Sequence, residues 1–161
     1  MSKSISNFFI NKDLDNNNSI VMCLSFSKQI HSKINELAKT ITKLDLSCCK
    51  INGTKLINLL EILGNFEKLQ TLKLNLNSIN IDEAIAIVTV IINCSNLKEL
   101  DFSNNNIILD KNSDKTILLI NKLKECPSLI NLNLSCNSIA KENIMEFEKN
   151  LPDCIVNWTY Y

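Results

Sequence analysis

Hydrophobic residues recur along the chain in an 11-residue pattern with the same spacing in four places. At residues 97–107 the pattern reads LKELDFSNNNI, with apolar side chains at Leu97, Leu100, Phe102 and Ile107. The other three copies are ITKLDLSCCKI (41–51), LQTLKLNLNSI (69–79) and LINLNLSCNSI (129–139). Successive copies begin 28, 28 and 32 residues apart. A frame that returns at a near-constant period predicts stacked units that bury their apolar faces against one another.

Each copy divides into a strand and a helix. The x-L-x-L-x portion alternates between polar and apolar residues and predicts a short strand with two inward side chains, while the residues after it follow the period of a helix. We expect two helical columns, at positions 17 and 19 of each copy, to pack on the sheet and on neighbouring helices. These columns are Ile57, Ile85, Ile117 and Met145, and Leu59, Ile87, Leu119 and Phe147.

Strand, turn and helix in strict succession predict a parallel sheet on one side of the molecule and helices on the other. Because helices take more room than strands, the stack should curve with the sheet on its concave side. The predicted fold class is therefore an α/β solenoid. The fourth residues of the copies should form one interior row, namely Leu44, Leu72, Leu100 and Leu132.

Position nine of the copies is occupied by Cys49, Asn77, Asn105 and Asn137. There the chain leaves the strand and its backbone groups lose their sheet partners. A buried asparagine amide both donates and accepts hydrogen bonds, so one asparagine per copy predicts a structural ladder of bonds to the backbone. Loss of one such side chain should cost on the order of 1 to 3 kcal/mol.

The frame LxxLxLxx(N/C)x(L/I), repeated about every 28 residues with a helix in each unit, resembles the leucine-rich repeat family and its ribonuclease-inhibitor-like class. The resemblance covers residues 41–151 and, less closely, residues 20–161. Cysteines at 49, 94 and 126 suit that class, which accepts cysteine at the turn and three residues before the next frame. The closing LPDCIVNW resembles an end-of-array segment, with Val156 and Trp158 as a final inward pair.

At 161 residues with 45% apolar content, the chain has room for one domain with its own core. Val21 to Phe26 is expected to form a first strand, and Ser27 to Thr40 an amphipathic helix. The predicted divisions are a polar tail or cap (1–19) and one repeat domain (20–161), made of an irregular cap (20–40), four repeats (41–151) and a terminal strand (152–161).

The third copy carries four extra residues near Ile108 to Ser113. Four residues correspond to about one helical turn, so we expect the insertion to lengthen the helix and keep its phase. A binding loop is the alternative.

Outward strand positions would form the concave face. Adjacent strands lie about 4.8 Å apart, so Asp45, Lys73 and Asp101 should be neighbours of alternating sign. They could neutralise one another or form a recognition stripe. The predicted partner-binding residues are Lys43, Asp45, Thr71, Lys73, Asn75, Leu76, Glu99, Asp101, Asn104, Asn131 and Asn133. These columns lack Trp, Tyr and Arg, which favours a weak or adaptable interaction over a tight anchor.

Charge and composition limit the classes of molecule that this chain can bind. The net charge is zero and every basic residue is lysine, which argues against nucleic acid. No apolar run approaches the roughly 20 residues of a membrane span, and the N-terminus lacks the apolar segment of a signal peptide, so we expect a cytoplasmic protein without a membrane partner. The seven cysteines are odd in number and mostly occupy repeat positions, which favours reduced thiols.

Enzymatic chemistry is poorly supported, and no cofactor is implied. His31 is the only histidine and belongs to the cap, so no base stands near the face. Cys48 and Cys136 are three strands apart, roughly 14 Å, too far to share a disulfide or a metal. Cys94 and Cys126 can lie close together, but no third ligand accompanies them. A thiol enzyme using Cys48 or Cys136 is a distant alternative.

The helix expected at Asp82 to Cys94 is apolar nearly all round. Packing between helices does not require Val90 and Ile92 to be apolar. If they are partly exposed, they could form the contact of a weak homodimer or of a docked partner; otherwise we expect a monomer.

The pattern and the resemblance together imply a non-enzymatic module that binds a protein partner through the concave sheet face. The main alternative is a structural or regulatory subunit that docks through its convex helices. The composition suggests AT-rich coding, which would suit an effector that an intracellular bacterium exports into host cells.

Overall fold

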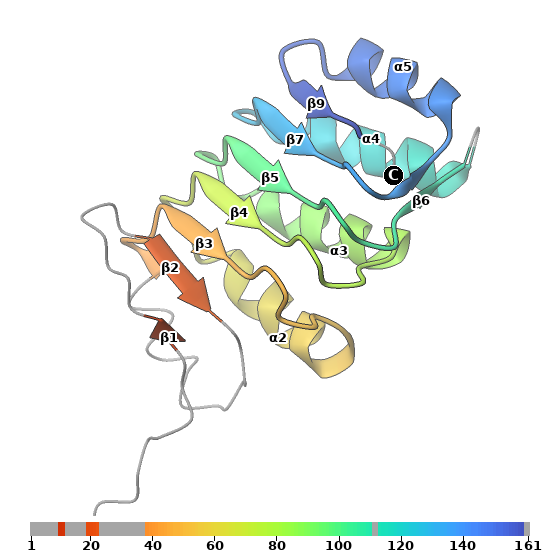
Figure 1. The fold of residues 1–161 in the computed structure, drawn as a ribbon. Coiled ribbons are helices and arrows are strands. Elements are labelled where there is room, and N and C mark those ends of the chain that lie inside the picture. The colour runs from red at the N-terminus through yellow and green to blue at the C-terminus, as the bar shows by residue number, and fades with distance from the viewer. Residues whose placement is uncertain (1–9, 12–18, 23–37, 111–112, 160–161) are drawn as a thin grey trace, which may run out of the picture.

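The computed structural model describes residues 10–11, 19–22, 38–110 and 113–159. Its main element is a seven-stranded sheet with the order β1-β2-β3-β4-β5-β7-β9 (Figure 1). The strands are β1 (Ile10–Asn11), β2 (Ser19–Met22), β3 (Lys43–Asp45), β4 (Thr71–Lys73), β5 (Glu99–Asp101), β7 (Asn131–Asn133) and β9 (Ile155–Asn157). The β1–β2 pair is antiparallel and every later pair is parallel, as strand–helix repeats require.

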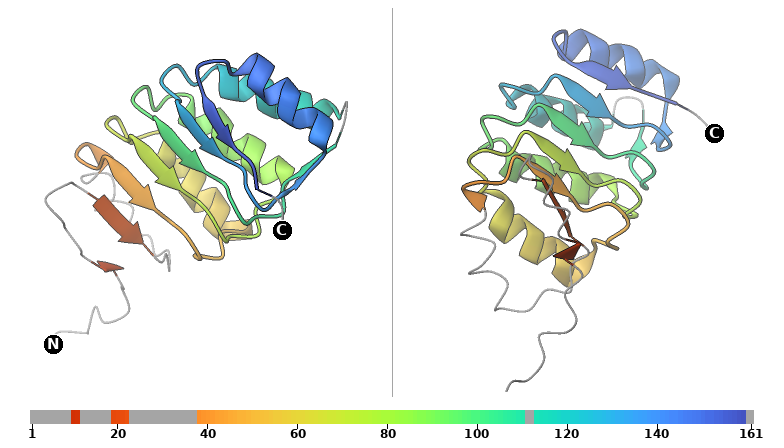
Figure 2. Two further views of the ribbon diagram at one scale, coloured as in Figure 1. Left: turned by 45° about the horizontal axis from the view of Figure 1, so that its top comes forward. Right: turned by 60° about the vertical axis from the view of Figure 1, so that its left-hand side comes forward.

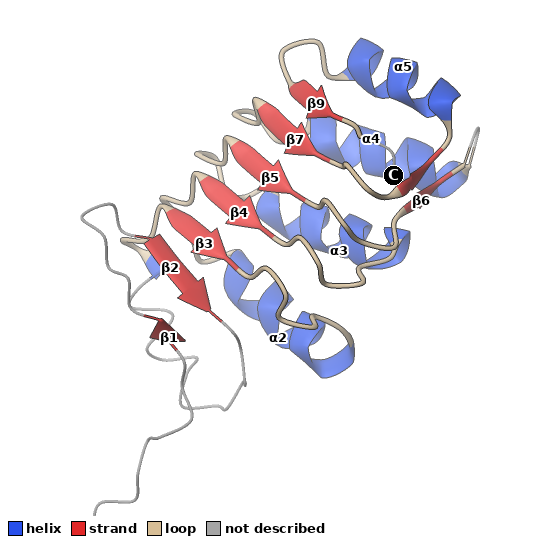
Figure 3. Cartoon of the chain, in the orientation of Figure 1, coloured by secondary structure: helices blue, strands red, loops and turns tan. Residues whose placement is uncertain are grey.

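Four described helices connect the parallel strands from β3 onward, and they all lie on one side of the sheet (Figures 2 and 3). They are α2 (Gly53–Leu63), α3 (Ile81–Ile91), α4 (Asp114–Lys124) and α5 (Lys141–Asn150). We call the opposite side, formed by the outward side chains of β3, β4, β5, β7 and β9, the open sheet face. No helix of the described residues covers it.

The predicted interior row of leucines is confirmed. Leu44, Leu72, Leu100 and Leu132 are register partners in successive strands, and each has at most 1% of its surface exposed. Val156 of β9 continues the row. The mixed α/β fold with a parallel sheet therefore follows from the leucine period.

Only one of the two predicted helical columns is buried. Leu59, Ile87, Leu119 and Phe147 at position 19 are at most 1% exposed. At position 17, by contrast, Ile57 is 59%, Ile117 49% and Met145 73% exposed, and Ile85 is half-buried. The expectation that both columns pack inward was wrong. Residues two apart on a helix are separated by about 200° and cannot both face the sheet.

The prediction for the four extra residues was also wrong. Helix α4 has 11 residues, the same as α2 and α3, so the insertion does not lengthen it. The chain instead forms β6 (Ile108–Leu109), which pairs in parallel with β8 (Ser138–Ile139) and precedes α4. The Asn143 amide fixes this pair by donating to the carbonyl of Leu109 over 2.6 Å.

The N-terminal region is described only in part. The strand predicted to begin at Val21 corresponds to β2. It begins two residues earlier, at Ser19, which is in register with Lys43. Strand β1 lies in the segment expected to be a tail or cap and adds an antiparallel edge that we did not predict. Residues 23–26, and the predicted helix up to residue 37, lie outside the described residues.

Candidate functional site

The open sheet face presents two rows of side chains, one from the first and one from the third residue of each three-residue strand. The middle residue points to the core, as the burial pattern of β3, β4 and β7 shows. The rows are Lys43, Thr71, Glu99, Asn131 and Ile155, and Asp45, Lys73, Asp101, Asn133 and Asn157. Strand pairing thus brings predicted residues from four repeats onto one surface.

The sequence interpretation missed the contribution of β9 to this face. Ile155 is 68% exposed, and the Asn157 amide donates to the side-chain oxygen of Asn131 over 2.7 Å. The signal was present, because the alternation in CIVNW that turns Val156 inward turns its two neighbours outward.

The carboxylates of the second row accept hydrogen bonds from backbone N–H groups two residues later in the same chain segment. Oδ1 of Asp45 accepts from the backbone N–H of Ser47 over 3.0 Å, and Oδ1 of Asp101 from that of Ser103 over 2.9 Å. Asn133 makes the same bond to Ser135 over 3.1 Å. These local turns fix the carboxylates where the strands end.

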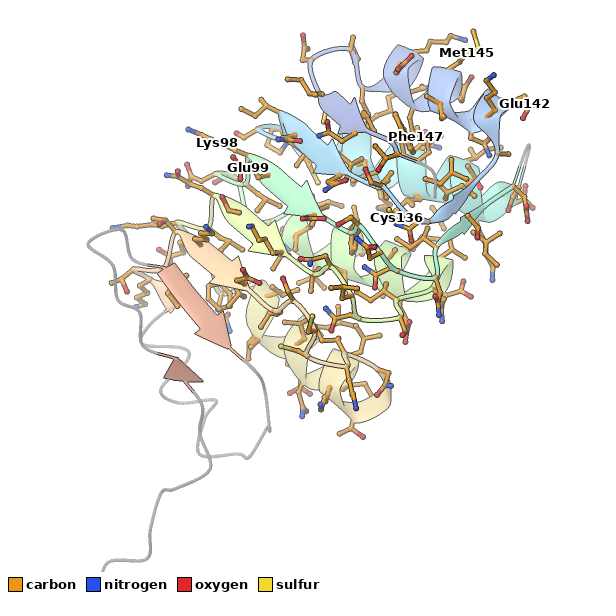
Figure 4. All side chains as sticks on the ribbon, in the orientation of Figure 1. Lys98, Glu99, Cys136, Glu142, Met145 and Phe147 are labelled. Atoms are coloured by element: carbon orange, nitrogen blue, oxygen red, sulfur yellow. The ribbon has the colours of Figure 1, made fainter. Side chains whose placement is uncertain are left out.

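The alternating charges of the second row lie side by side among the described residues without forming a direct ion pair. Lys73 lies between Asp45 and Asp101 in register, yet no ion pair joins it to either carboxylate within the described chain. The first row contains one direct link, from the Thr71 hydroxyl to Glu99 over 3.2 Å. Figure 4 shows Glu99 beside Lys98 at the beginning of β5.

A shallow depression of about 110 Å³ lies across the middle of the open sheet face. Its polar lining residues are Thr71, Lys73, Glu99, Asp101, Asn131, Asn133 and Asn157. Lysine ammonium, carboxylate and amide groups therefore line one surface feature that four strands share. Such a surface can make many hydrogen bonds to a polar partner and offers little apolar contact.

The remaining predicted contacts lie beyond the strand ends. The Asn75 side-chain oxygen accepts from the Ser47 hydroxyl over 2.5 Å, which joins two repeats. Position eight has a left-handed backbone in every repeat, with φ between 53° and 60° at Cys48, Leu76, Asn104 and Cys136. Leu76 is also 52% exposed.

The left-handed conformation at Leu76 gives a stability prediction. Leucine is disfavoured at positive φ by about 1 kcal/mol or more, whereas asparagine, found at the equivalent position 104, adopts it readily. Leu76→Asn is therefore expected to raise the free energy of unfolding by about 1 kcal/mol, measured by urea titration. The control is Ile130→Asn, since Ile130 is equally exposed at 52% and is not among the residues with positive φ. An equal gain in both variants would contradict the backbone explanation.

Beneath the open face, the position-nine asparagines connect neighbouring repeats. The Asn77 side-chain oxygen accepts from the backbone N–H groups of Cys49 (2.9 Å) and Ile51 (3.2 Å), and its amide donates to the carbonyls of Leu46 and Leu74 (both 2.9 Å). Each side chain thus serves its own turn and the preceding one.

Asn105 repeats this arrangement. Its oxygen accepts from the N–H groups of Asn77 (3.0 Å) and Ile79 (2.9 Å), and its amide donates to the carbonyls of Leu74 (3.0 Å) and Phe102 (2.9 Å). The oxygen of Asn137 accepts from the N–H of Ile107. The ladder therefore extends from the first to the fourth repeat.

The two cysteines considered for a thiol enzyme, Cys48 and Cys136, lie on separate strand ends. Cys48 follows β3 and Cys136 follows β7, with β4 and β5 between them. No group of three or more His, Cys, Asp or Glu side chains in the described residues is arranged to hold a metal ion. The single histidine, His31, lies outside the described residues.

Cys94 and Cys126 occupy equivalent places five residues before β5 and β7, while Cys154 directly precedes β9. Burial raises the pKa of Cys94 to about 11. The pKa of Cys126 also rises to about 11, through burial first and then through the charges of Cys94, Glu125 and Cys154. Burial raises the pKa of Cys154 as well. Thiols held protonated in this way are poor nucleophiles at neutral pH.

Thiol labelling should separate these groups. With iodoacetamide at pH 8, exposed Cys48 is expected to react at about the rate of a free thiol, while Cys94 and Cys126 stay unlabelled until the chain unfolds. Peptide mass spectrometry before and after denaturation measures the difference. Labelling of Cys48 far faster than free cysteine would instead indicate an activated thiolate and a thiol enzyme.

The surface of α3 shows the partial exposure that the sequence predicts at Val90 and Ile92. Val90 and Ile92 of the α3 region are half-buried and pack against the core. The exposed large apolar side chains of the described helices are Ile57, Ile117, Leu118 and Met145. Within the described residues, no helix combines the length and apolar character that a membrane crossing requires.

Comparisons with known proteins agree with this architecture. A family model described as "Leucine Rich repeat" matches residues 38–54 and 93–110. The structure of leiomodin-1 actin-binding site 2 superposes with a TM-score of 0.64 at 14% identity, covering 86% of this chain and 80% of that one. No match was found among curated protein sequences.

A second solved structure, internalin C2 from Listeria monocytogenes str. 4b F2365, has 24% identity over 75% of this chain and 62% of that one. Its TM-score of 0.39 is too low to support an argument. Assignment to the ribonuclease-inhibitor-like class stays a prediction.

Proposed function

Because this chain is a leucine-rich-repeat protein, we propose that it is a non-enzymatic module that binds another protein through its open sheet face. One observation carries the proposal. Five adjacent strands direct polar side chains out of a face that no described helix covers, and Lys73 there is left without a described ion-pair partner. Charges that the fold leaves unpaired are available to a partner.

The chemistry of this face defines the partner. Lys73, Glu99 and Asp101 offer both signs of charge, and the amides of Asn131 and Asn133 offer donors and acceptors. A partner with a mixed polar surface would fit them, and the bound interface would be hydrated. The curvature predicted from the sequence, with the sheet on the concave side, would let the partner contact several strands at once.

The structural neighbour supports such a use of the scaffold. The leiomodin-1 structure is that of an actin-binding site, so a solenoid of similar fold can hold a protein partner. A role as an effector exported into host cells remains part of the proposal on composition alone.

A second candidate function is docking through the helices as a structural or regulatory subunit. Ile57, Ile117, Leu118 and Met145 are between 44% and 73% exposed on three helices. Apolar side chains that recur on one side of a solenoid can form an interface.

A charge exchange on the open sheet face tests the first proposal. Lys73→Glu combined with Glu99→Lys keeps the net charge and disturbs no buried group, because Glu99 is exposed and Lys73 only half-buried. We expect recovery of captured partner proteins, quantified by mass spectrometry, to fall about tenfold, which corresponds to about 1.4 kcal/mol of binding free energy.

Two further variants complete this experiment. Glu67→Lys with Lys68→Glu exchanges adjacent exposed charges away from the face and should leave capture unchanged. Ile57→Ser with Ile117→Ser removes apolar surface from the helices. Loss of the captured proteins only in this last variant would reject the sheet-face proposal and support docking through the helices.

A further inference from the structure

The sheet ends at β9, whose outer edge has no strand beside it among the described residues. In the inner repeats, the N–H at position six donates to the next strand, as from Leu74 to Asp101 (2.8 Å) and from Leu134 to Asn157 (3.1 Å). Trp158 occupies this position in the last unit. Its backbone N–H therefore points to the outer edge.

The same equivalence places two more residues at this edge. Val156 corresponds to Leu132, so both its N–H and its carbonyl face outward. Cys154 corresponds to Ile130, whose carbonyl accepts from Ile155 of the next strand over 2.9 Å. The outer edge of β9 thus presents the carbonyl of Cys154, the N–H and carbonyl of Val156, and the N–H of Trp158, in that order.

This edge is short, with three residues in β9, but its side chains offer no protection against strand pairing. Natural edge strands are commonly shielded by lysine, proline or an inward charge. Residues 154–159, CIVNWT, contain none of these. Ile155 is 68% exposed, and Val156 and Trp158 are half-buried, whereas Leu132 and Leu134 are fully buried in the preceding unit. The last unit is therefore incompletely covered.

The tryptophan supplies an independent sign of missing cover. Trp158 and Phe147 make a T-shaped contact with ring centroids 5.3 Å apart, and the buried indole N–H of Trp158 has no acceptor among the described residues. Buried donors are nearly always paired in folded proteins. The unpaired indole is therefore a sign that this unit is incompletely packed.

The charges on α5 indicate which neighbour would cover this unit. The second residue of α3, Asp82, pairs with Lys115 of the following helix over 2.7 Å. The second residue of α5 is Glu142, which lies near the beginning of that helix in Figure 4 and has no described helix after it. Lys149 lies seven residues on, on the same side of the helix. If two α5 helices lie side by side in opposite directions, Glu142 of one helix is opposite Lys149 of the other, and the charges are complementary.

We propose that two copies of this chain associate through β9 about a two-fold axis perpendicular to the sheet. Such symmetry makes the paired β9 strands antiparallel and places the two α5 helices side by side in opposite directions. The backbone N–H and carbonyl of Val156 in each copy would form two hydrogen bonds with Val156 of the other copy. Each Trp158 backbone N–H would donate to the Cys154 backbone carbonyl of the second copy. Glu142 then faces Lys149 of the second copy, twice.

The arrangement has two consequences. The zero net charge of the chain creates no long-range repulsion between copies. The open sheet faces become one continuous surface, because the sheet passes from one copy into the other.

Sedimentation velocity of the full chain over a wide concentration series tests the association. The parent should shift from monomer to dimer as concentration rises. Glu142→Lys and Lys149→Glu should each raise the dissociation constant about tenfold, because each turns two attractive pairs into repulsive ones. An equimolar mixture of the two variants should restore association, since every facing pair is again of opposite sign.

Two more variants control the result. Lys68→Glu reverses an exposed charge far from α5 in the sequence and should leave the dissociation constant unchanged. Val156→Pro removes the donor at the axis and should abolish the dimer, with circular dichroism reporting whether β9 still folds. Monomer at every concentration, or a dimer that neither charge reversal weakens, would overturn the proposal, and the mixing result does not depend on how Val156→Pro folds.

Discussion

Phe147→Ala is expected to lower the free energy of unfolding by about 3 to 5 kcal/mol, the usual cost of removing a buried aromatic ring. The Phe147 ring, labelled in Figure 4, is fully buried, and it makes a T-shaped contact with the Trp158 ring. Truncation leaves a cavity between α5 and β9 in place of the ring. Urea unfolding followed by circular dichroism measures the change.

Met145→Ala provides the matched control on the same helix. Met145 lies two residues away and is 73% exposed, so its truncation should change the free energy of unfolding by less than about 0.5 kcal/mol. Similar losses in both variants would mean that α5 packs in a different rotation. The pair therefore also tests which helical column faces the sheet.

Asn105→Ala is expected to cost about 3 kcal/mol, the upper end of the range for stranding buried polar groups. The side chain is only 7% exposed and makes hydrogen bonds to backbone groups of two repeats. Alanine leaves the N–H groups of Asn77 and Ile79 without their acceptor. The loss should appear as a lower midpoint in urea, with an unchanged slope if the transition stays two-state.

Asn106→Ala controls for asparagine chemistry at the neighbouring position. Asn106 is exposed, and its backbone N–H donates to the Ile79 carbonyl over 2.8 Å, a bond that alanine retains. Its stability should match the parent within about 0.5 kcal/mol. Thermal unfolding of Asn105→Ala that coincides with this control would show that the ladder contributes nothing.

The leucine period predicted the fold because it acts at every repeat in the same way. Four leucines in equivalent places can be buried together only if the strands stack in register. The asparagines at position nine were likewise identified as polar residues at a turn that needs backbone partners. In both cases local chemistry and global packing require the same arrangement.

The wrong structural predictions concern positions where the hydrophobic period is compatible with more than one structure. Both Phe147 and Met145 are apolar, and only the rotation of α5 determines which one is buried. The extra residues near Ile108 could extend a helix or form a strand, and the strand was selected by pairing with Ser138, which sequence spacing does not reveal. The charge pattern of Asp45 and Lys73 indicated neighbours, but not that the carboxylate would turn toward its own backbone.

The asparagine ladder also determines how the repeats respond to local opening. Each rung reaches into the preceding repeat, so unfolding one unit removes partners from the unit before it. Repeats coupled in this way lose their structure together, because partial opening carries the cost of the exposed interface. Native-state hydrogen exchange should therefore give the amides of Cys49, Ile51, Asn77 and Ile79 one common free energy of opening, that of the whole array.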